Sequence, residues 1–231
     1  MACPIPDSLS FEQASVLPLP LSTAASGMFQ QDGLGLALPT AAPAERPEAV
    51  LVWGGSTAVG SNAIQLARNA GYRVVATASP HNFDYLRSLG AAATIDRNSP
   101  AAVDELVAAI GDSPLAGSLA IGSGSLPKVM RVAARVPGAK RVSSAAPGFI
   151  TRILALGAPR GVRVSGIWGG SLKDNAVGPT IYVDFLPTAL ATGAYRAEPK
   201  ADIVGHGLDA IPVGLQRLRK GVSAKKLVVT L

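Results

Sequence analysis

Residues 50–67 read VLVWGGSTAVGSNAIQLA, and this stretch sets the architecture expected of the whole chain. Residues 50–53 are apolar and rich in β-branched side chains, which is typical of an inner strand of a parallel sheet because both of its faces are buried. Beyond the glycines, apolar side chains recur at helical spacing, beginning with Val59 and Ala63. The stretch therefore predicts a strand, a tight glycine-rich turn and a helix.

The turn between this strand and this helix is suited to an anion. Its glycines, Gly54 and Gly55, let the chain turn and let a phosphate approach the backbone, while Gly60 lets the helix pack closely on the strand. Ser56 and Thr57 add hydroxyl donors beside the first amides of the helix. The spacing departs from the G-x-G-x-x-G pattern, however, so an ordinary strand-to-helix connection is the alternative interpretation.

A second strand follows at residues 72–78, after a helix that ends near Gly71, a position typical of a left-handed C-cap glycine. The two strands and their connecting helix form a β-α-β unit, which makes the sheet parallel. An NAD site usually has a carboxylate at the end of this second strand. Here the strand is followed by Ser79, Pro80, His81 and Asn82. The missing acid favours NADP, although Ser79 and Pro80 are also ordinary helix-capping residues.

Composition excludes several classes of protein. The chain has 231 residues, one cysteine, two histidines and a formal net charge of +6. It contains no long apolar run and no signal-peptide pattern, so we expect no membrane span. A single cysteine, Cys3, cannot form an internal disulfide, which favours a reducing, cytoplasmic location. The basic residues are scattered and lack interleaved aromatics, so we expect no nucleic-acid partner, and the few histidines and cysteines predict no metal site.

The rest of the chain alternates strands with helices, which predicts an α/β doubly wound parallel sheet. The expected strands cover residues 50–53, 72–78, 93–96, 115–121, 139–145, 162–168, 202–204 and 227–231. The expected helices begin at Phe11, where Ser10 and Gln13 match a capping box, and continue at about 21–30, 58–70, 81–89, 99–110, 126–135, 178–191 and 207–219. We expect Pro18 and Pro20 to interrupt the helical pattern between the first two.

Small polar or glycine-rich turns follow five of these strands. They cover residues 54–57, 79–82, 122–125, 143–146 and 169–171. In doubly wound sheets, ligands bind beyond the carboxyl ends of the strands. The turns therefore predict a ligand site along one edge of the sheet.

Several of these segments together resemble a known family. The segments VLVWGGSTAVG, ATASPHNFD, SLGA and KGVSAKKLVV, together with residues 178–187, resemble the medium-chain dehydrogenase/reductase superfamily. Within it the chain is most similar to the zinc-free, quinone-reductase-like branch that includes fungal trans-acting enoyl reductases. The resemblance implies an NADPH-dependent oxidoreductase with no metal, namely a Rossmann-type enoyl or quinone reductase of secondary metabolism.

The resemblance also assigns residues to parts of the cofactor. It implies that the pyrophosphate lies against Ser56, Thr57, Ala58 and Val59, after Gly54 and Gly55, and that the 2′-phosphate lies against Ser79, Pro80, His81 and Asn82. Many family members have Lys where Asn82 stands, so we expect Arg97 to supply the cation instead. The same comparison implies that Ser144 and Ala145 lie near the nicotinamide, and that Val222 and Ser223 lie near the bound cofactor.

The resemblance implies an additional N-terminal GroES-like barrel in family members, and we expect this chain to lack it. The expected organisation is therefore a crossover segment at 1–48, a dinucleotide-binding Rossmann domain at 49–194, and a segment at 195–231 that packs on the barrel in relatives. Without the barrel, the last segment is expected to expose apolar area or to meet a partner. The resemblance allows a homo-oligomer or a polyketide-synthase partner in addition to a small-molecule substrate.

No acid–base pair in the sequence identifies a catalytic residue. His81 is expected at the phosphate and His206 in a local turn, while Tyr182 and Tyr195 are interpreted as core or rim residues rather than proton donors. Two functions stay open. The first is an NADPH-dependent reductase that transfers hydride to an α,β-unsaturated carbonyl. The second is a nucleotide-binding remnant, or pseudoenzyme, without turnover.

Overall fold

The computed structural model describes residues 2–231 and is built around a six-stranded sheet with the order β3-β2-β1-β4-β5-β6. All neighbouring pairs in this sheet are parallel. Its strands are β1 (Ala49–Trp53), β2 (Arg73–Ala78), β3 (Ala91–Asp96), β4 (Leu115–Ala120), β5 (Arg141–Ser144) and β6 (Arg163–Gly166). This is the strand order of a doubly wound nucleotide-binding sheet, so the fold predicted from the sequence is confirmed.

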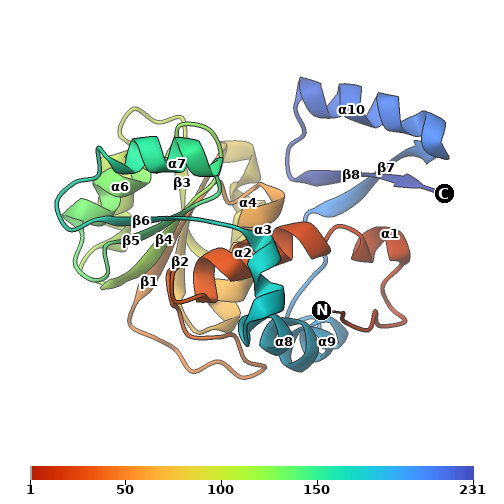
Figure 1. Cartoon of the computed structure of the whole chain (residues 1–231), viewed down its shortest axis with the longest axis horizontal. Coiled ribbons are helices and arrows are strands. Elements are labelled where there is room, and N and C mark those ends of the chain that lie inside the picture. Colours follow the sequence, from red (N-terminus) through yellow and green to blue (C-terminus); the bar gives the residue numbers. More distant parts are fainter. Residues whose placement is uncertain (1) are drawn as a thin grey trace.

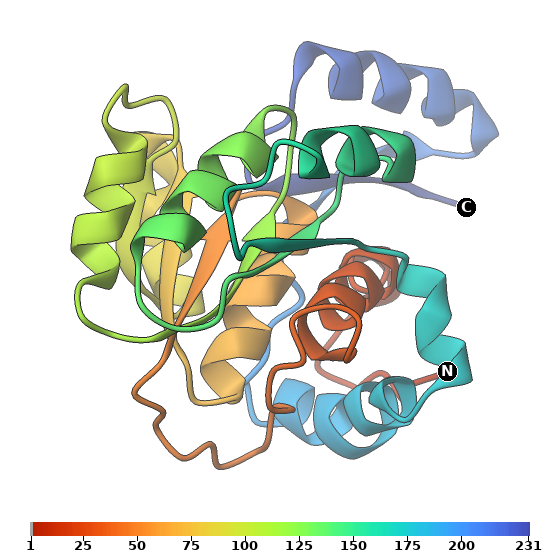
Figure 2. The same cartoon turned by 60° about the vertical axis from the view of Figure 1, so that its left-hand side comes forward.

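Helices cover both faces of this sheet (Figure 2). Alternate residues of β1 point to opposite faces: Val50 and Val52 belong to one buried core, while Leu51 and Trp53 belong to the other. The first core is covered by α2 (Pro18–Phe29), α3 (Ala58–Asn69) and α4 (Phe83–Leu89), and the second by α5 (Ala102–Ile110) and α6 (Ser125–Arg135). Because β1 is buried on both sides, its end and the turn that follows it are held in the middle of the structure.

The N-terminal region confirms one prediction and corrects another. Helix α1 (Phe11–Ala14) has the expected capping box, in which the amide of Gln13 donates to Ser10 Oγ at 3.3 Å. Helix α2, by contrast, begins at Pro18 and includes Pro20, so the expectation that these prolines interrupt the helix was wrong. Amides in the first turn of a helix have no intrahelical acceptor, and prolines there remove no hydrogen bond.

Two further helical segments differ from the sequence prediction. Helix α7 (Gly148–Ala155) was not predicted, because the preceding Pro147-Gly148 pair is a turn signal; here Pro147 is the N-cap residue instead. The single helix expected at 178–191 consists of α8 (Val177–Pro179), a π-helical segment η3 (Thr180–Phe185) and α9 (Leu186–Ala191). The remaining short helical turns are η1 (Pro80–Asn82), η2 (Gly169–Asp174) and η4 (Leu208–Ala210).

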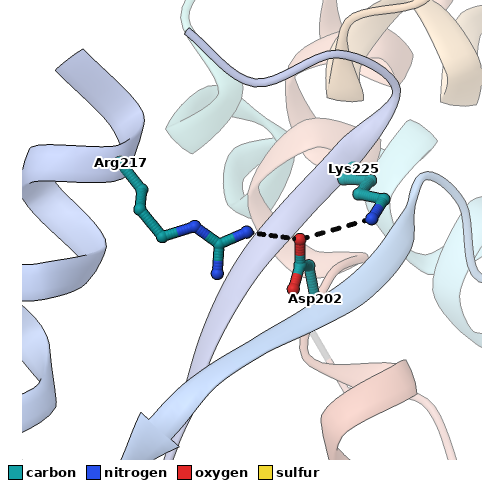
Figure 3. A network of polar contacts seen from close by, with 3 residues as sticks. All are labelled: Asp202, Arg217 and Lys225. Carbon is teal, nitrogen blue, oxygen red and sulfur yellow. Dashed lines mark hydrogen bonds and ion pairs between the residues drawn. The ribbon is translucent and has the colours of Figure 1, made fainter. Parts of the chain in front are cut away.

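Residues after 199 form a small lobe that stands beside the main sheet (Figure 1). It contains β7 (Lys200–His206), α10 (Ile211–Lys220) and β8 (Lys225–Thr230), and β7 pairs with β8 in parallel as a separate two-stranded sheet. Figure 3 shows Asp202 of β7 between Arg217 of α10 and Lys225 of β8, with N–O distances of 2.7 and 3.5 Å. This carboxylate therefore links all three elements of the lobe.

One side of the lobe exposes an apolar stripe. Its members follow a spacing of three and four residues along η4 and α10 and are 42–70% exposed: Leu208, Ile211, Leu215 and Leu218. Two parallel strands and one helix bury too little apolar surface to be stable by themselves. The exposed apolar area expected for the end of the chain is thus present. Within residues 2–231, no helix has both the length and the apolar character needed to cross a bilayer.

Candidate cofactor site

The glycine-rich turn is fastened to the neighbouring strand. Gly54 has a positive φ of 86°, and its amide donates to Thr77 Oγ1 at 3.0 Å. The amide of Gly55 donates to the main-chain oxygen of Thr77 at 2.8 Å. Thr77 is fully buried at the end of β2. Two hydrogen bonds to one buried residue therefore fix the path of the chain between β1 and α3.

Thr57 is the N-cap of α3. Its Oγ1 accepts from the amide of Gly60 at 3.0 Å and donates to the oxygen of Gly54 at 2.7 Å. The expectation that this hydroxyl serves as a donor beside the backbone is therefore wrong, because its one proton is already given to Gly54. Thr57 shapes the turn instead.

The amides that follow the turn are available to an external acceptor. Among residues 2–231, no acceptor is found for the N–H groups of Ser56, Ala58 and Val59, nor any partner for the Ser56 hydroxyl. These residues are half-buried at the N-terminus of the twelve-residue helix α3. Unpaired amides and the helix dipole together favour an anion at this position.

The other glycines of the turn serve packing. A Cβ on Gly60 would lie 2.2 Å from the oxygen of Gly54, so only glycine allows α3 to approach the turn this closely. A Cβ on Gly55 would lie 2.8 Å from Leu86 Cδ2 and 3.0 Å from Ile64 Cδ1. Gly55 therefore faces the core between α3 and α4, and its bare side does not face the proposed anion.

The end of β2 meets the lobe. Asn82 Nδ2 donates to Ser223 Oγ at 2.8 Å, and His81 Nε2 lies 3.1 Å from the same oxygen. The structure thus brings together two segments that are more than 140 residues apart in the chain and that the sequence assigned to the same cofactor. Ser79 is half-buried and Pro80 is exposed beside them, while Val222 is the half-buried residue before Ser223.

Arg97 lies at the same corner of the sheet. Its amide donates to the oxygen of Ala78 at 3.0 Å, which places its backbone directly beside Ser79. The side chain is exposed, and within residues 2–231 it forms no ion pair. Arg97 is therefore a cation without an internal counter-ion, next to the end of β2.

The remaining predicted residues, Ser144 and Ala145, lie at the end of β5. Ser144 is fully buried, and its Oγ accepts from the amide of Ala146 and from Thr151 Oγ1, both at 3.2 Å. Ala145 is half-buried and lines a hollow of about 270 Å³ together with Gly122 and Pro147. Ala145 can therefore contact a ligand here, whereas the Ser144 side chain is buried and its oxygen already accepts two hydrogen bonds from neighbours.

A row of amide side chains on α3 was not predicted from the sequence. Asn62, Gln65 and Asn69 are buried, and each donates to a main-chain oxygen of residues 194–198 at 3.1–3.2 Å. The amide of Arg196 also donates back to Gln65 Oε1 at 2.8 Å. The row attaches residues 194–198, which precede the lobe, to α3, the helix that follows the glycine-rich turn. Its only signal in the sequence was the spacing of three amides at i, i+3 and i+7.

The two tyrosines considered as proton donors lie inside the protein. Tyr195 is buried, donates to Asn62 Oδ1, and has its pKa raised by desolvation. Tyr182 pairs with Ser22 and Pro18, and burial also raises its pKa. His206 lies in the lobe beside Thr230. Within the described part of the chain, no group of three or more His, Cys, Asp or Glu side chains is arranged to hold a metal ion.

The fold is of the Rossmann type, and the comparisons with known proteins specify the family. No protein-family model matches the chain. A dehydrogenase from Aspergillus niger, orf1, is 44% identical over 233 residues, covering 100% of this chain and 67% of its own length. The trans-enoyl reductase himH from Aspergillus japonicus is 36% identical and is covered over 64% of its length.

Solved structures share the fold. The CurK enoyl reductase superposes with a TM-score of 0.74 at 21% identity, covering 98% of this chain and 64% of that one. A quinone oxidoreductase from Pseudomonas syringae gives 0.69 at 20% identity, covering 98% and 67%. The chain belongs to the medium-chain dehydrogenase/reductase superfamily of oxidoreductases. It spans about two thirds of the length of the relatives it matches.

Proposed function

We propose that this chain binds NADP(H) as the nucleotide-binding part of a reductase that acts on α,β-unsaturated carbonyl compounds. The observation that carries the proposal is the arrangement at one corner of the sheet. Unpaired amides at the start of α3 lie at the end of β1, and the end of β2 carries no carboxylate but has Arg97 beside it. The amides suit a pyrophosphate, and Arg97 suits a 2′-phosphate.

The positions of the other residues support this assignment. His81, Asn82 and Ser223 form one polar cluster beside Ser79. Ala145 lines the hollow at the ends of β4 and β5, where the nicotinamide of a cofactor lying across the strand ends would reach. The bound cofactor supplies the hydride. The chain itself contributes binding and orientation, and we assign no catalytic residue.

The name of the relative himH supports an enoyl substrate, because that protein is a trans-enoyl reductase. The test is a fluorescence titration of the chain with NADPH, followed by an assay of NADPH oxidation in the presence of an enone. Saturable binding together with enone-dependent oxidation supports the reductase. Failure to bind NADPH would exclude the proposal.

A second candidate, a nucleotide-binding chain without turnover, is favoured by the exposed stripe of the lobe. Binding of NADPH without oxidation of it, in the titration above, distinguishes this candidate from the first.

For the organisation of the chain, we propose the division expected from the sequence. It consists of a crossover segment at 1–48, a dinucleotide-binding domain at 49–194, and a segment at 195–231 that packs on a further domain. The stripe of Leu208, Ile211, Leu215 and Leu218 supports that packing, because such residues are normally covered.

A further inference from the structure

An apolar hollow lies between the N-terminal arm, defined as residues 2–10, and the helices α1, α2 and α9. Its volume is about 390 Å³, within the range of about 300–1,000 Å³ that is usual for small-molecule sites. Tyr182, Leu186 and Leu190 form one wall and are spaced by four residues, so they lie on the same side of η3 and α9. Cys3 of the arm also lines the hollow. The hollow shares no residue with the proposed cofactor site.

The polarity of this hollow selects the class of its ligand. None of the side chains that line it is charged. Its principal polar group is a pair of hydroxyls, Ser22 Oγ and Tyr182 OH, which are 2.6 Å apart. Tyr182 donates its proton to the oxygen of Pro18 at 3.1 Å, so Ser22 donates to the phenol oxygen and keeps lone pairs free to accept. Burial raises the pKa of Tyr182, which keeps the pair neutral at pH 7.

We propose that this hollow is a binding site for an uncharged molecule with an aliphatic chain and one hydrogen-bond donor, such as a medium-chain alcohol. The apolar walls contribute to affinity by removing the aliphatic part of the ligand from water, and the Ser22 oxygen accepts a hydrogen bond from the ligand's donor. An aliphatic molecule with a charged head group is expected to bind more weakly, because among residues 2–231 no charged side chain lines the walls and a buried unpaired charge is costly. The inference does not depend on cofactor binding or on reductase activity.

The single cysteine of the chain provides the measurement. Cys3 is half-buried and lines the hollow, so an occupant limits the access of a thiol reagent. The rate at which Ellman's reagent modifies Cys3 is measured while n-octanol is titrated, and octanoate serves as the charged analogue. We expect n-octanol to slow the reaction saturably, roughly tenfold at about ten times its Kd. Octanoate at the same concentrations leaves the rate unchanged.

Two variants locate the bound molecule. Leu190→Trp fills the hollow and is expected to abolish the protection of Cys3 by n-octanol. The control Val183→Trp changes a side chain that is 60% exposed and lies outside the lining, so it is expected to retain that protection. Ser22→Ala removes the acceptor and is expected to raise the Kd of n-octanol about fivefold, as the loss of one hydrogen bond does. The proposal is overturned if n-octanol fails to slow the modification, if octanoate slows it equally, or if Ser22→Ala leaves the Kd unchanged. Because Ser22→Ala adds no bulk, its effect on the Kd of n-octanol can be measured even if Leu190→Trp does not fold.

Discussion

Replacing Gly60 with alanine tests how closely α3 must approach the turn that precedes it. The added Cβ would lie 2.2 Å from the oxygen of Gly54 and 2.7 Å from the Cα of Gly55. Both contacts are with backbone, so no side chain can rotate away from them. The turn is also held by its hydrogen bonds to Thr77 and to Thr57. Relief therefore requires α3 to move away from the end of β1.

The size of the effect follows from two opposing contributions. Overpacking a buried site costs about 1–3 kcal/mol, and a clash with fixed backbone lies near the upper end of that range. Alanine in place of glycine in a helix returns up to about 1 kcal/mol. The expected net loss is therefore about 2 kcal/mol of the free energy of unfolding, which lowers Tm by about 4–8 °C in a chain of this size.

Thermal and urea unfolding measure this loss, and Gly214→Ala in α10 is the matched control. At Gly214 the nearest heavy atom to an added Cβ is Val204 Cγ2 at 3.8 Å, an ordinary contact, so that variant is expected to be as stable as the parent or more stable. Gly60→Ala should also weaken NADPH binding, because the moved helix carries the unpaired amides. If Gly60→Ala matches the parent in Tm, the close approach of α3 does not constrain the turn and the reasoning fails.

Three further changes have defined outcomes. Asn62→Ala leaves the buried hydroxyl of Tyr195 without its acceptor and should lower the free energy of unfolding in urea by about 2–3 kcal/mol. The exposed control Asn98→Ala should lower it by almost nothing, and equal effects of the two variants would contradict the role of the amide row. The hydrogen bond from Arg217 lowers the pKa of Asp202 below 3.8. This carboxylate therefore stabilises the fold above that pH and ceases to do so as the pH falls through its lowered pKa. Asp202→Asn should be less stable than the parent at pH 7, and the difference in stability should vanish in strong acid. Ser223→Ala removes the oxygen that holds Asn82 and His81 in one cluster, so it should raise the Kd of NADPH about fivefold while sparing NADH. An equal change for both cofactors would place Ser223 outside the 2′-phosphate site.

The sheet and its first β-α-β unit could be predicted because they depend on local pattern. Residues near one another in the sequence determine three of these features. They are the apolar run of β1, the glycine at position 71 with its φ of 87°, and the need for glycine at position 60. The same holds for the absence of a carboxylate directly after β2, which is visible in the sequence. These features required no knowledge of distant contacts.

The contacts that complete the site depend on long-range folding and were not predictable in detail. Polar residues on a helix usually face solvent, so Asn62, Gln65 and Asn69 gave no indication that they bind the main chain of residues 194–198. The engagement of the Thr57 hydroxyl with Gly54 depends on the turn geometry. Likewise, β7 and β8 pair with each other and not with the main sheet, and no periodicity encodes which strands pair.

The most direct test of the proposed cofactor site compares NADPH with NADH on the parent chain and on Arg97→Ala by fluorescence titration. The two cofactors differ only in the 2′-phosphate, so their affinity ratio isolates the contribution of that corner of the sheet. We expect the parent to bind NADPH at least about tenfold more tightly than NADH, as one charge-assisted hydrogen bond allows, and Arg97→Ala to abolish most of that preference. Equal affinities in the parent chain, or an unchanged preference in Arg97→Ala, would contradict the account.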